Sequence, residues 1–202
     1  MSDTDRISIE ADETLAENWH RLSRIRFAYR RLDGTTQHLA REVYRSGHAA
    51  AVLPYDKARD TVLLIRQFRL PPLLCGDPAW LLEACAGIVD EGQSPIDTAR
   101  LEAQQEMGCR LHNLRPAFSL YTSPGATTEK LHLFRADYTP ADRTGGGGGL
   151  RGEGEEIEVV ELPLAEAWQM ALSGTIVDIK TVLLLQSVML EEAMNGRREP
   201  PP

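Results

Sequence analysis

The chain has few cysteines, no long apolar run and no excess of positive charge, and each absence excludes a class of protein. Cys75, Cys85 and Cys109 are too few and too scattered for a disulfide framework, and no two have the spacing of zinc ligands. We therefore expect a protein of the reducing cytoplasm. The N-terminus, MSDTDRISIEADE, lacks the basic segment and apolar core of a signal peptide.

Membrane and nucleic-acid functions are not expected either. The longest apolar run, VLLLQSVML at 182–190, is far shorter than a membrane span. The formal net charge of −8 argues against binding to nucleic acid or to an anionic membrane. An anionic substrate would therefore have to be met by local positive charge or by a metal ion.

The 202 residues, 42% of them hydrophobic, are enough for one substantial domain, or for one domain with a small appendage. Residues 22–32 alternate apolar side chains with arginines, the period-two pattern of a half-buried strand, and Asp33-Gly34 then predicts a hairpin turn into a second strand at 38–44. Further apolar or alternating runs predict strands at 48–55, 60–68, 80–87, 114–122, 130–138 and 157–163.

Three helices are expected among these strands. Ser94 is a candidate N-cap, Pro95 suits a first helical turn and Gly108 a C-cap, which together predict a helix over 95–107. Residues 164–173 and 178–194 predict two more. Strand runs with inserted helices and no regular βαβ alternation favour an α+β fold with a mixed sheet.

The helix over 95–107 carries two carboxylates on one face. Glu102 and Glu106 are four residues apart, which puts their Cβ atoms roughly 6 Å from each other. Like charges at this spacing are unfavourable unless a cation lies between them. The pair is either an ordinary solvated helix face or a set of hard oxygen ligands for Mg²⁺.

The stretch from Gly87 to Cys109 resembles the Nudix box, G-x5-E-x7-R-E-U-x-E-E-x-G-U, where U is apolar. The box positions match without a gap at Gly87, Glu102, Glu106, Gly108 and Cys109. Three positions depart from it, with Gln93 in place of the first Glu, Leu101 in place of the Arg, and Gln105 in place of the first Glu of the EE pair.

The resemblance extends from about Trp19 to about Leu190. It is carried by REVY (41–44), LIRQFR (64–69), E-x-C-A-G (83–87), SPGATTE (123–129), a glycine-rich loop before IEVVELP, and IKTVLLL (179–185). Together these resemble the GDP-mannose pyrophosphatase branch of the ADP-ribose pyrophosphatase-like Nudix hydrolases. The resemblance implies a mixed sheet between helices in a domain over 47–195, an antiparallel N-terminal subdomain over 1–46 exchanged across a homodimer, and a polar tail at 196–202.

The resemblance also implies a metal site. Its ligands would be Glu102, Glu106, the carbonyl of Ala86 and Glu155, holding Mg²⁺, with Mn²⁺ as an alternative. Gln105 would contribute less charge than the usual Glu, which lowers metal affinity. Leu101 removes an arginine that usually braces the box carboxylates.

Substrate contacts are implied at Trp19, Arg41, Glu42, Arg69, Gly87, Glu129 and Lys180. Trp19 would stack on a nucleobase, with a buried strand anchor as the alternative. Arg69 would bind phosphate oxygens, with a surface ion pair as the alternative. Glu129 and Lys180 could otherwise be ordinary solvated charges.

The expected reaction is hydrolysis of the pyrophosphate of a nucleoside diphosphate sugar, with GDP-mannose giving GMP and mannose 1-phosphate, and ADP-ribose as the alternative substrate. Metal would neutralise charge that builds on the phosphoryl oxygens. Glu155 or Glu156 is the candidate general base and Glu129 the second candidate. The glycines at 145–149 would form a lid or a simple flexible connector. The altered box leaves open a non-catalytic nucleotide-sugar binding protein.

Overall fold

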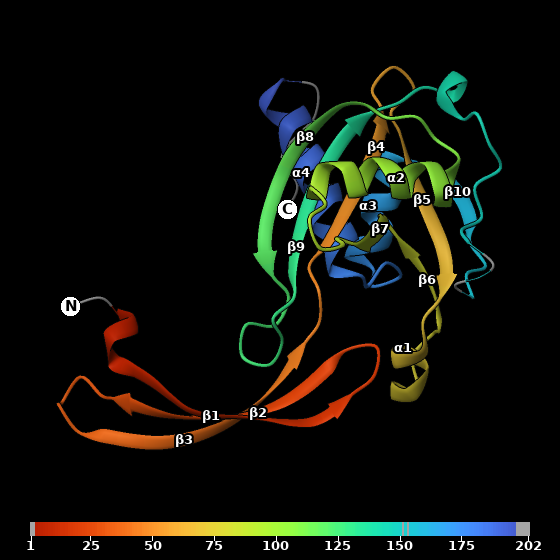
Figure 1. Ribbon diagram of the computed structural model, residues 1–202. Helices are drawn as coiled ribbons and strands as arrows, with labels where there is room; N and C mark the ends of the chain where they lie inside the picture. Colours follow the sequence, from red (N-terminus) through yellow and green to blue (C-terminus); the bar gives the residue numbers. More distant parts are fainter. Residues whose placement is uncertain (1–2, 151, 153, 197–202) are drawn as a thin grey trace. The chain divides into compact units, whose positions relative to one another are not determined.

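The computed structural model describes residues 3–150, 152 and 154–196, and the chain divides into two units (Figure 1). The first comprises residues 1–48 and 120–130, and the second comprises residues 49–119 and 131–202. The polar tail expected at 196–202 lies outside the described residues except for Gly196.

The first unit is a three-stranded antiparallel sheet that follows a short 3-10 helix, η1 (Asp3–Arg6). Its strands are β1 (Ile7–Glu17), β2 (Arg21–Arg30) and β3 (Thr36–Arg45), in that order. The expected hairpin is confirmed, since β2 pairs with β3 and Gly34 turns the chain with a φ of 85°. The 120–130 segment joins this unit because Ala126 and Thr128 bond the backbone of Tyr44.

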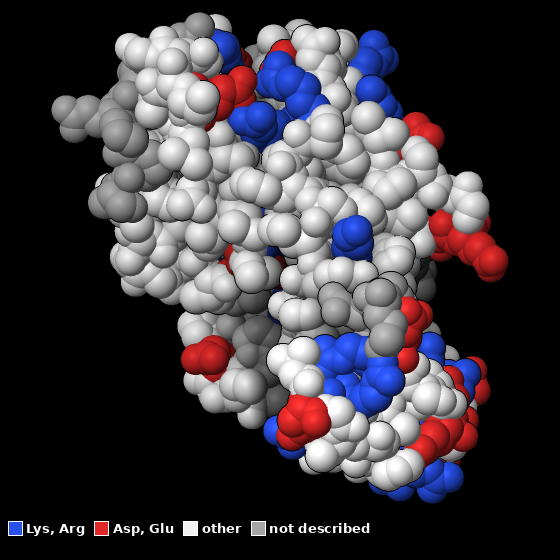
Figure 2. Space-filling view, turned by 90° about the vertical axis from the view of Figure 1, so that its left-hand side faces the viewer, with Lys and Arg blue, Asp and Glu red and all other residues white. Residues whose placement is uncertain are grey.

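β1 was not expected from the sequence. Nearly all of its residues are exposed, and the strand is held by backbone pairing with β2 along its length. Arg side chains gather on this sheet next to Asp and Glu (Figure 2). Asp12, for example, receives N–H groups from both Arg21 and Arg45.

The second unit is built on a mixed sheet that has seven strands in the described residues. The main path runs β10 (Glu158–Pro163), β5 (Thr61–Phe68), β4 (Ala49–Asp56), β9 (Lys130–Asp137) and β8 (His112–Tyr121). β4 and β9 are parallel, and β4 is antiparallel to β5, which confirms the expected mixed sheet. A 3-10 turn, η2 (Pro140–Asp142), follows β9.

The prediction of a single strand over 80–87 is wrong, because these residues form two strands that are separated at Ala84. β6 (Trp80–Glu83) pairs with β5, whereas β7 (Cys85–Ile88) pairs with β4. The backbone N–H of Ala84 leaves the sheet and donates to the Thr181 hydroxyl at 2.7 Å. Because of this break, the two halves of one apolar run pair with two different neighbouring strands, β5 and β4.

Helices cover both faces of this sheet (Figure 1). Alternate residues of β4 point to opposite faces, as the two-residue period requires. Ala51 and Leu53 pack in one cluster with α3 (Leu164–Leu172) and α4 (Ile179–Met194), while Ala50 and Val52 pack in another with α2 (Pro95–Met107). A short helix, α1 (Leu70–Cys75), with proline in its first turn, lies in the connection between β5 and β6. No described helix combines the length and apolar character that crossing a bilayer requires.

Candidate active site

The helix α2 begins and ends where the sequence predicts. Ser94 caps it by accepting the N–H of Asp97, and Pro95 occupies the first turn. Gly108 ends the helix in the left-handed region, with a φ of 61°. Ala99, Ala103 and Met107 face the core, which fixes the rotation of the helix about its axis. This rotation turns Glu102 and Glu106 toward β7.

Both carboxylates of α2 lie against two consecutive residues of β7. Glu106 is 1% exposed, and its Oε2 accepts the backbone N–H of Ala86 at 3.1 Å. Glu102 covers Gly87 so closely that a Cβ at Gly87 would lie 1.8 Å from Glu102 Oε1. The absence of a side chain at Gly87 is therefore what admits the Glu102 carboxylate.

The pKa of Glu106 shows that its carboxylate is buried and lies near other negative charges. Burial raises its pKa, with the charges of Glu102 and Glu155 adding to the increase, to about 7. Hydrogen bonds from the Cys85 thiol and the Ala86 amide oppose this increase. Burial, followed by the negative charge of Glu106, raises the pKa of the Cys85 thiol well above its usual value, so the thiol is a neutral donor to Glu106.

A divalent cation fits this chemistry. Oxygen donors are available from Glu102, Glu106, the Ala86 backbone and Glu155, which is the donor type that Mg²⁺ and Mn²⁺ prefer. The mutual repulsion of the three carboxylates, visible in the pKa of Glu106, would be relieved by bound positive charge. Within the described residues, no three His, Cys, Asp or Glu side chains are already gathered as a closed metal cluster.

The three departures from the box have different surroundings. Leu101 is 47% exposed on the outer side of α2. Gln93 contacts Asp90 and Thr98 in the turn before the helix. The Gln105 carbonyl accepts the N–H of Gly149 at 3.3 Å.

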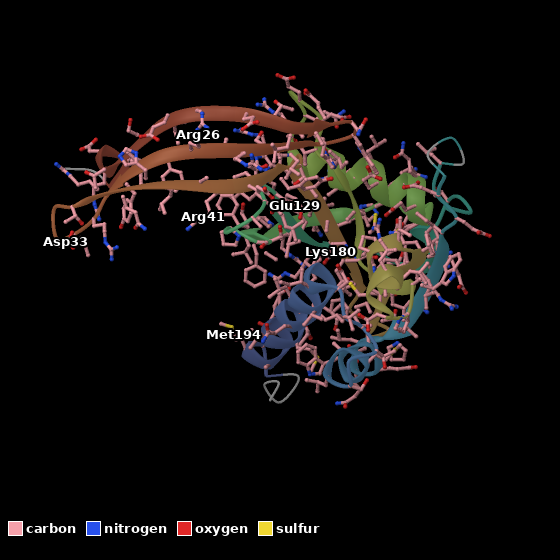
Figure 3. The ribbon with its side chains drawn as sticks, turned by 90° about the horizontal axis from the view of Figure 1, so that it is seen from below. Arg26, Asp33, Arg41, Glu129, Lys180 and Met194 are labelled. Carbon is pink, nitrogen blue, oxygen red and sulfur yellow. The ribbon has the colours of Figure 1, made fainter. Side chains whose placement is uncertain are left out.

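A second cluster of charges lies immediately before β7 in the chain. Glu83 is 2% exposed, and Arg69 donates two hydrogen bonds to its carboxylate, at 2.8 and 3.0 Å. Lys180, at the start of α4, also donates to Glu83 and donates to Asp178 at 2.8 Å (Figure 3). Burial would raise the pKa of Glu83, but the two cations outweigh it and hold that pKa below its usual value.

Thr181 connects this charge cluster to the backbone of the site. Its hydroxyl accepts the Ala84 N–H and donates to Asp178, whose carboxylate also caps α4 by accepting the Thr181 N–H at 3.0 Å. Five consecutive residues, 83–87, thus meet Arg69 and Lys180 at one end and the two α2 carboxylates at the other. Burial is the largest influence on the pKa of Arg69 and lowers it. The hydrogen bonds and charge of Glu83 outweigh burial, so the pKa is raised, and the negative charge of Glu106 adds a smaller increase.

Most of the residues predicted from sequence belong to the second unit, namely Arg69, Ala86, Gly87, Glu102, Glu106, Glu155, Glu156 and Lys180. Glu155 is half-buried, and its Oε2 accepts the Leu150 N–H at 2.8 Å. Glu156, the other candidate base from this loop, is exposed.

Four predicted substrate residues, Trp19, Arg41, Glu42 and Glu129, belong to the first unit. Trp19 is 83% exposed and stacks on His20, so the alternative of a buried anchor is wrong for this chain. Arg41 lies on the β2–β3 hairpin that ends near Asp33 (Figure 3), where it lines two concavities of about 420 and 310 Å³. Glu42 accepts from Arg24 at 3.4 Å, and Glu129 is half-buried. Their substrate roles stay predictions.

Sequence reasoning missed three residues that hold the site together: Glu83, Cys85 and Thr181. The E-x-C-A-G pattern contained Glu83 and Cys85, but nothing local indicates their partners. Glu83 and Lys180 are 97 residues apart in the chain, as are Ala84 and Thr181. Only the packing of α4 beside β6 creates these contacts.

Comparison with known proteins identifies the family of this chain. A family model described as the GDP-mannose pyrophosphatase NudK N-terminal domain matches residues 6–44, and one described as the NUDIX domain matches residues 45–184. The chain belongs to the Nudix hydrolase family. The resemblance seen in the box and in the motifs around it is thereby confirmed.

Relatives of this Nudix hydrolase match over nearly its whole length. A GDP-mannose pyrophosphatase of Cronobacter sakazakii is 43% identical over 94% of this chain and 98% of that protein. One of Klebsiella pneumoniae is 40% identical over 96% of each. A crystal structure of an ADP compounds hydrolase, 20% identical, superposes with a TM-score of 0.72 over 96% of this chain and 97% of that one, which confirms the fold.

Proposed function

We propose that this Nudix hydrolase cleaves the pyrophosphate of a nucleoside diphosphate sugar, with GDP-mannose as substrate and GMP and mannose 1-phosphate as products. The observation that carries the proposal is the placing of two α2 carboxylates, Glu102 and Glu106, against Ala86 and Gly87. The names of the relatives at 43% and 40% identity support the choice of GDP-mannose.

The metal in this proposal is Mg²⁺, with Mn²⁺ as an alternative, held by Glu102, Glu106, Glu155 and the Ala86 carbonyl. When bound, it would polarise the phosphoryl oxygens and stabilise the leaving phosphate. Buried Glu106 is oriented by the Ala86 N–H and the Cys85 thiol, so it keeps one position without the arginine that Leu101 replaces.

The remaining residues bind substrate and move a proton. A water oxygen bonds to phosphorus while the P–O bond to the leaving phosphate breaks, and Glu155 takes the proton of the water, with Glu156 and Glu129 as the other candidates. Arg69 uses two of its five N–H donors on Glu83, and Lys180 uses one of its three on Glu83 and one on Asp178. The other donors are suited to phosphate oxygens.

We further propose a cytoplasmic homodimer in which the first unit is exchanged and Trp19 stacks on the base. Large apolar side chains are exposed in that unit, among them Ile9, Trp19 and Leu32, which are 62%, 83% and 92% exposed. This exposure supports the proposal that a second protomer covers the surface. The free thiols of Cys75, Cys85 and Cys109 suit a reducing compartment. Light scattering of the purified chain tests the dimer, and a monomeric mass contradicts it.

A substrate panel tests the proposed reaction. The purified chain is incubated with GDP-mannose, ADP-ribose and other nucleotide sugars, each with Mg²⁺, with Mn²⁺ and with EDTA. We expect metal-dependent release of GMP from GDP-mannose. Faster turnover of ADP-ribose would assign that substrate instead. No turnover of any substrate, with retained binding of GDP-mannose, would favour a binding protein disabled by Gln93, Leu101 and Gln105.

A further inference from the structure

The glycine-rich segment 144–149 is bonded to the C-terminal end of α2. The last carbonyls of an α-helix have no partners within the helix. Here Thr144 and Gly145 donate to the Gly108 carbonyl at 2.9 and 3.2 Å, and Gly148 donates to the Glu106 carbonyl at 2.9 Å. With the bond from Gly149 to Gln105, the segment supplies partners for three carbonyls at this helix end.

The fit between segment and helix depends on glycine at particular positions. A Cβ at Gly147 would lie 2.3 Å from the Glu106 carbonyl oxygen, and one at Gly108 would lie 2.3 Å from the Gly145 carbonyl oxygen. Both glycines also have left-handed φ values, 64° and 61°. Gly146 is different, since a Cβ there would meet nothing within 4 Å and its φ lies outside the left-handed region.

The same segment holds Glu155 at its other end. Gly148 accepts the Ile157 N–H at 3.3 Å with its carbonyl while its own N–H binds Glu106. Leu150, the residue that follows the segment, donates to the Glu155 carboxylate at 2.8 Å and accepts the Glu155 N–H at 3.4 Å. A Cβ at Gly149 would lie 2.5 Å from Glu155 Oε2, so the carboxylate rests directly on the segment.

We propose that residues 144–149 form a brace that sets the position of the Glu155 carboxylate relative to Glu106, with Gly147 as the main positioning residue. This proposal rests on the proposed function, in which both carboxylates hold the metal. It replaces the two alternatives drawn from composition, a lid and a simple connector. A run of five glycines suggests mobility, but here the glycines permit close backbone contact with α2.

The test compares Gly147→Ala with the matched control Gly146→Ala in the full chain. Both add one methyl group and remove one glycine from the same run, but only the first meets the Glu106 carbonyl. Mn²⁺ binding to the substrate-free protein is measured by electron paramagnetic resonance, and kcat and KM are measured with GDP-mannose. Urea unfolding monitors the folded state of each variant.

We expect Gly147→Ala to weaken Mn²⁺ binding by about tenfold or more, the effect typical of disturbing groups that orient metal ligands. Its kcat should fall with little change in KM, while Gly146→Ala stays within about twofold of wild type, as expected for an open position. Equal losses in both variants would indicate that glycine mobility matters, and unchanged Mn²⁺ binding in Gly147→Ala would refute the brace directly.

A second variant covers a failure of Gly147→Ala to fold. Gly149→Ala directs its methyl group at side-chain atoms of Glu155 and Ile157, away from the helix backbone, and should show the same loss of Mn²⁺ binding. Wild-type Mn²⁺ binding in this variant would overturn the proposal. The binding measurement is independent of turnover, so a wild-type chain that binds Mn²⁺ without hydrolysing GDP-mannose would contradict the proposed function alone.

Discussion

Replacing Gly87 by alanine should displace the Glu102 carboxylate while leaving the fold intact. The new Cβ would lie 1.8 Å from Glu102 Oε1, and contacts under 3.0 Å essentially never occur, so the carboxylate must move by at least 1.2 Å (3.0 minus 1.8). The obstacle is the end of a flexible side chain, and Gly87 lies in a β-strand outside the left-handed region. The free energy of unfolding should therefore change by less than about 1 kcal/mol.

The cost should appear in turnover. A misplacement of about 1 Å in a catalytic site can lower the rate by roughly 100-fold, and we expect a fall in kcat of that order for Gly87→Ala. GMP release from GDP-mannose at saturating Mg²⁺ measures it, with urea unfolding in parallel. Wild-type kcat in this variant would refute the assigned role of the Gly87 contact.

A double-mutant cycle separates this mechanism from a general disturbance of β7. In a Glu102→Ala background the new methyl group no longer meets a carboxylate, so adding Gly87→Ala should cause no further loss of the residual activity. An equally large additional loss in that background would show that Gly87→Ala acts through some other contact.

The remaining predictions concern stability and the first unit. Glu83→Gln leaves Arg69 and Lys180 facing a neutral amide, so the free energy of unfolding in urea should fall by about 3 kcal/mol, and an unchanged value would mean that the buried cluster contributes nothing. Because the pKa of Glu83 is lowered in the folded state, its contribution is present above its usual value of 4.5 and is lost as pH falls through the folded value. Wild type should therefore lose more stability on acidification than Glu83→Gln, and parallel pH profiles would contradict this. Ser94→Ala should cost about 1 kcal/mol by removing the α2 cap, whereas Ser94→Thr, which keeps a hydroxyl that can accept the Asp97 N–H and donate to the Asp97 carboxylate, should cost less. Trp19→Ala should raise KM for GDP-mannose with little effect on unfolding, because the indole is 83% exposed, and an unchanged KM would argue against base stacking.

The parts of the fold that the sequence predicts are those determined by neighbours along the chain. Ser94, Pro95 and Gly108 give the limits of α2 because capping and φ preference act within a few residues. The hairpin at Asp33-Gly34 was predicted for the same reason. The box spacing also indicated that Glu102 and Glu106 share a face, and both carboxylates lie against β7.

The parts that the sequence does not predict depend on distant partners. β1 alternates apolar and polar residues only over residues 7–12, nearly all of its residues are exposed, and its backbone pairs with β2 along its length. The break between β6 and β7 at Ala84 cannot be predicted from the apolar run at 80–87, because it depends on the Thr181 hydroxyl in α4. Five glycines in a row look alike in the sequence, yet a Cβ at Gly147 would meet the backbone of α2 and a Cβ at Gly146 would meet nothing within 4 Å.

The measurement that tests the central claim most directly compares turnover with binding in Glu106→Gln. The amide keeps the size of the side chain but removes a negative charge from the proposed metal site. We predict that GMP release from GDP-mannose in Mg²⁺ falls to background while equilibrium binding of GDP-mannose stays close to that of wild type. Turnover of Glu106→Gln at the wild-type rate would contradict the claim that the α2 carboxylates carry the chemistry.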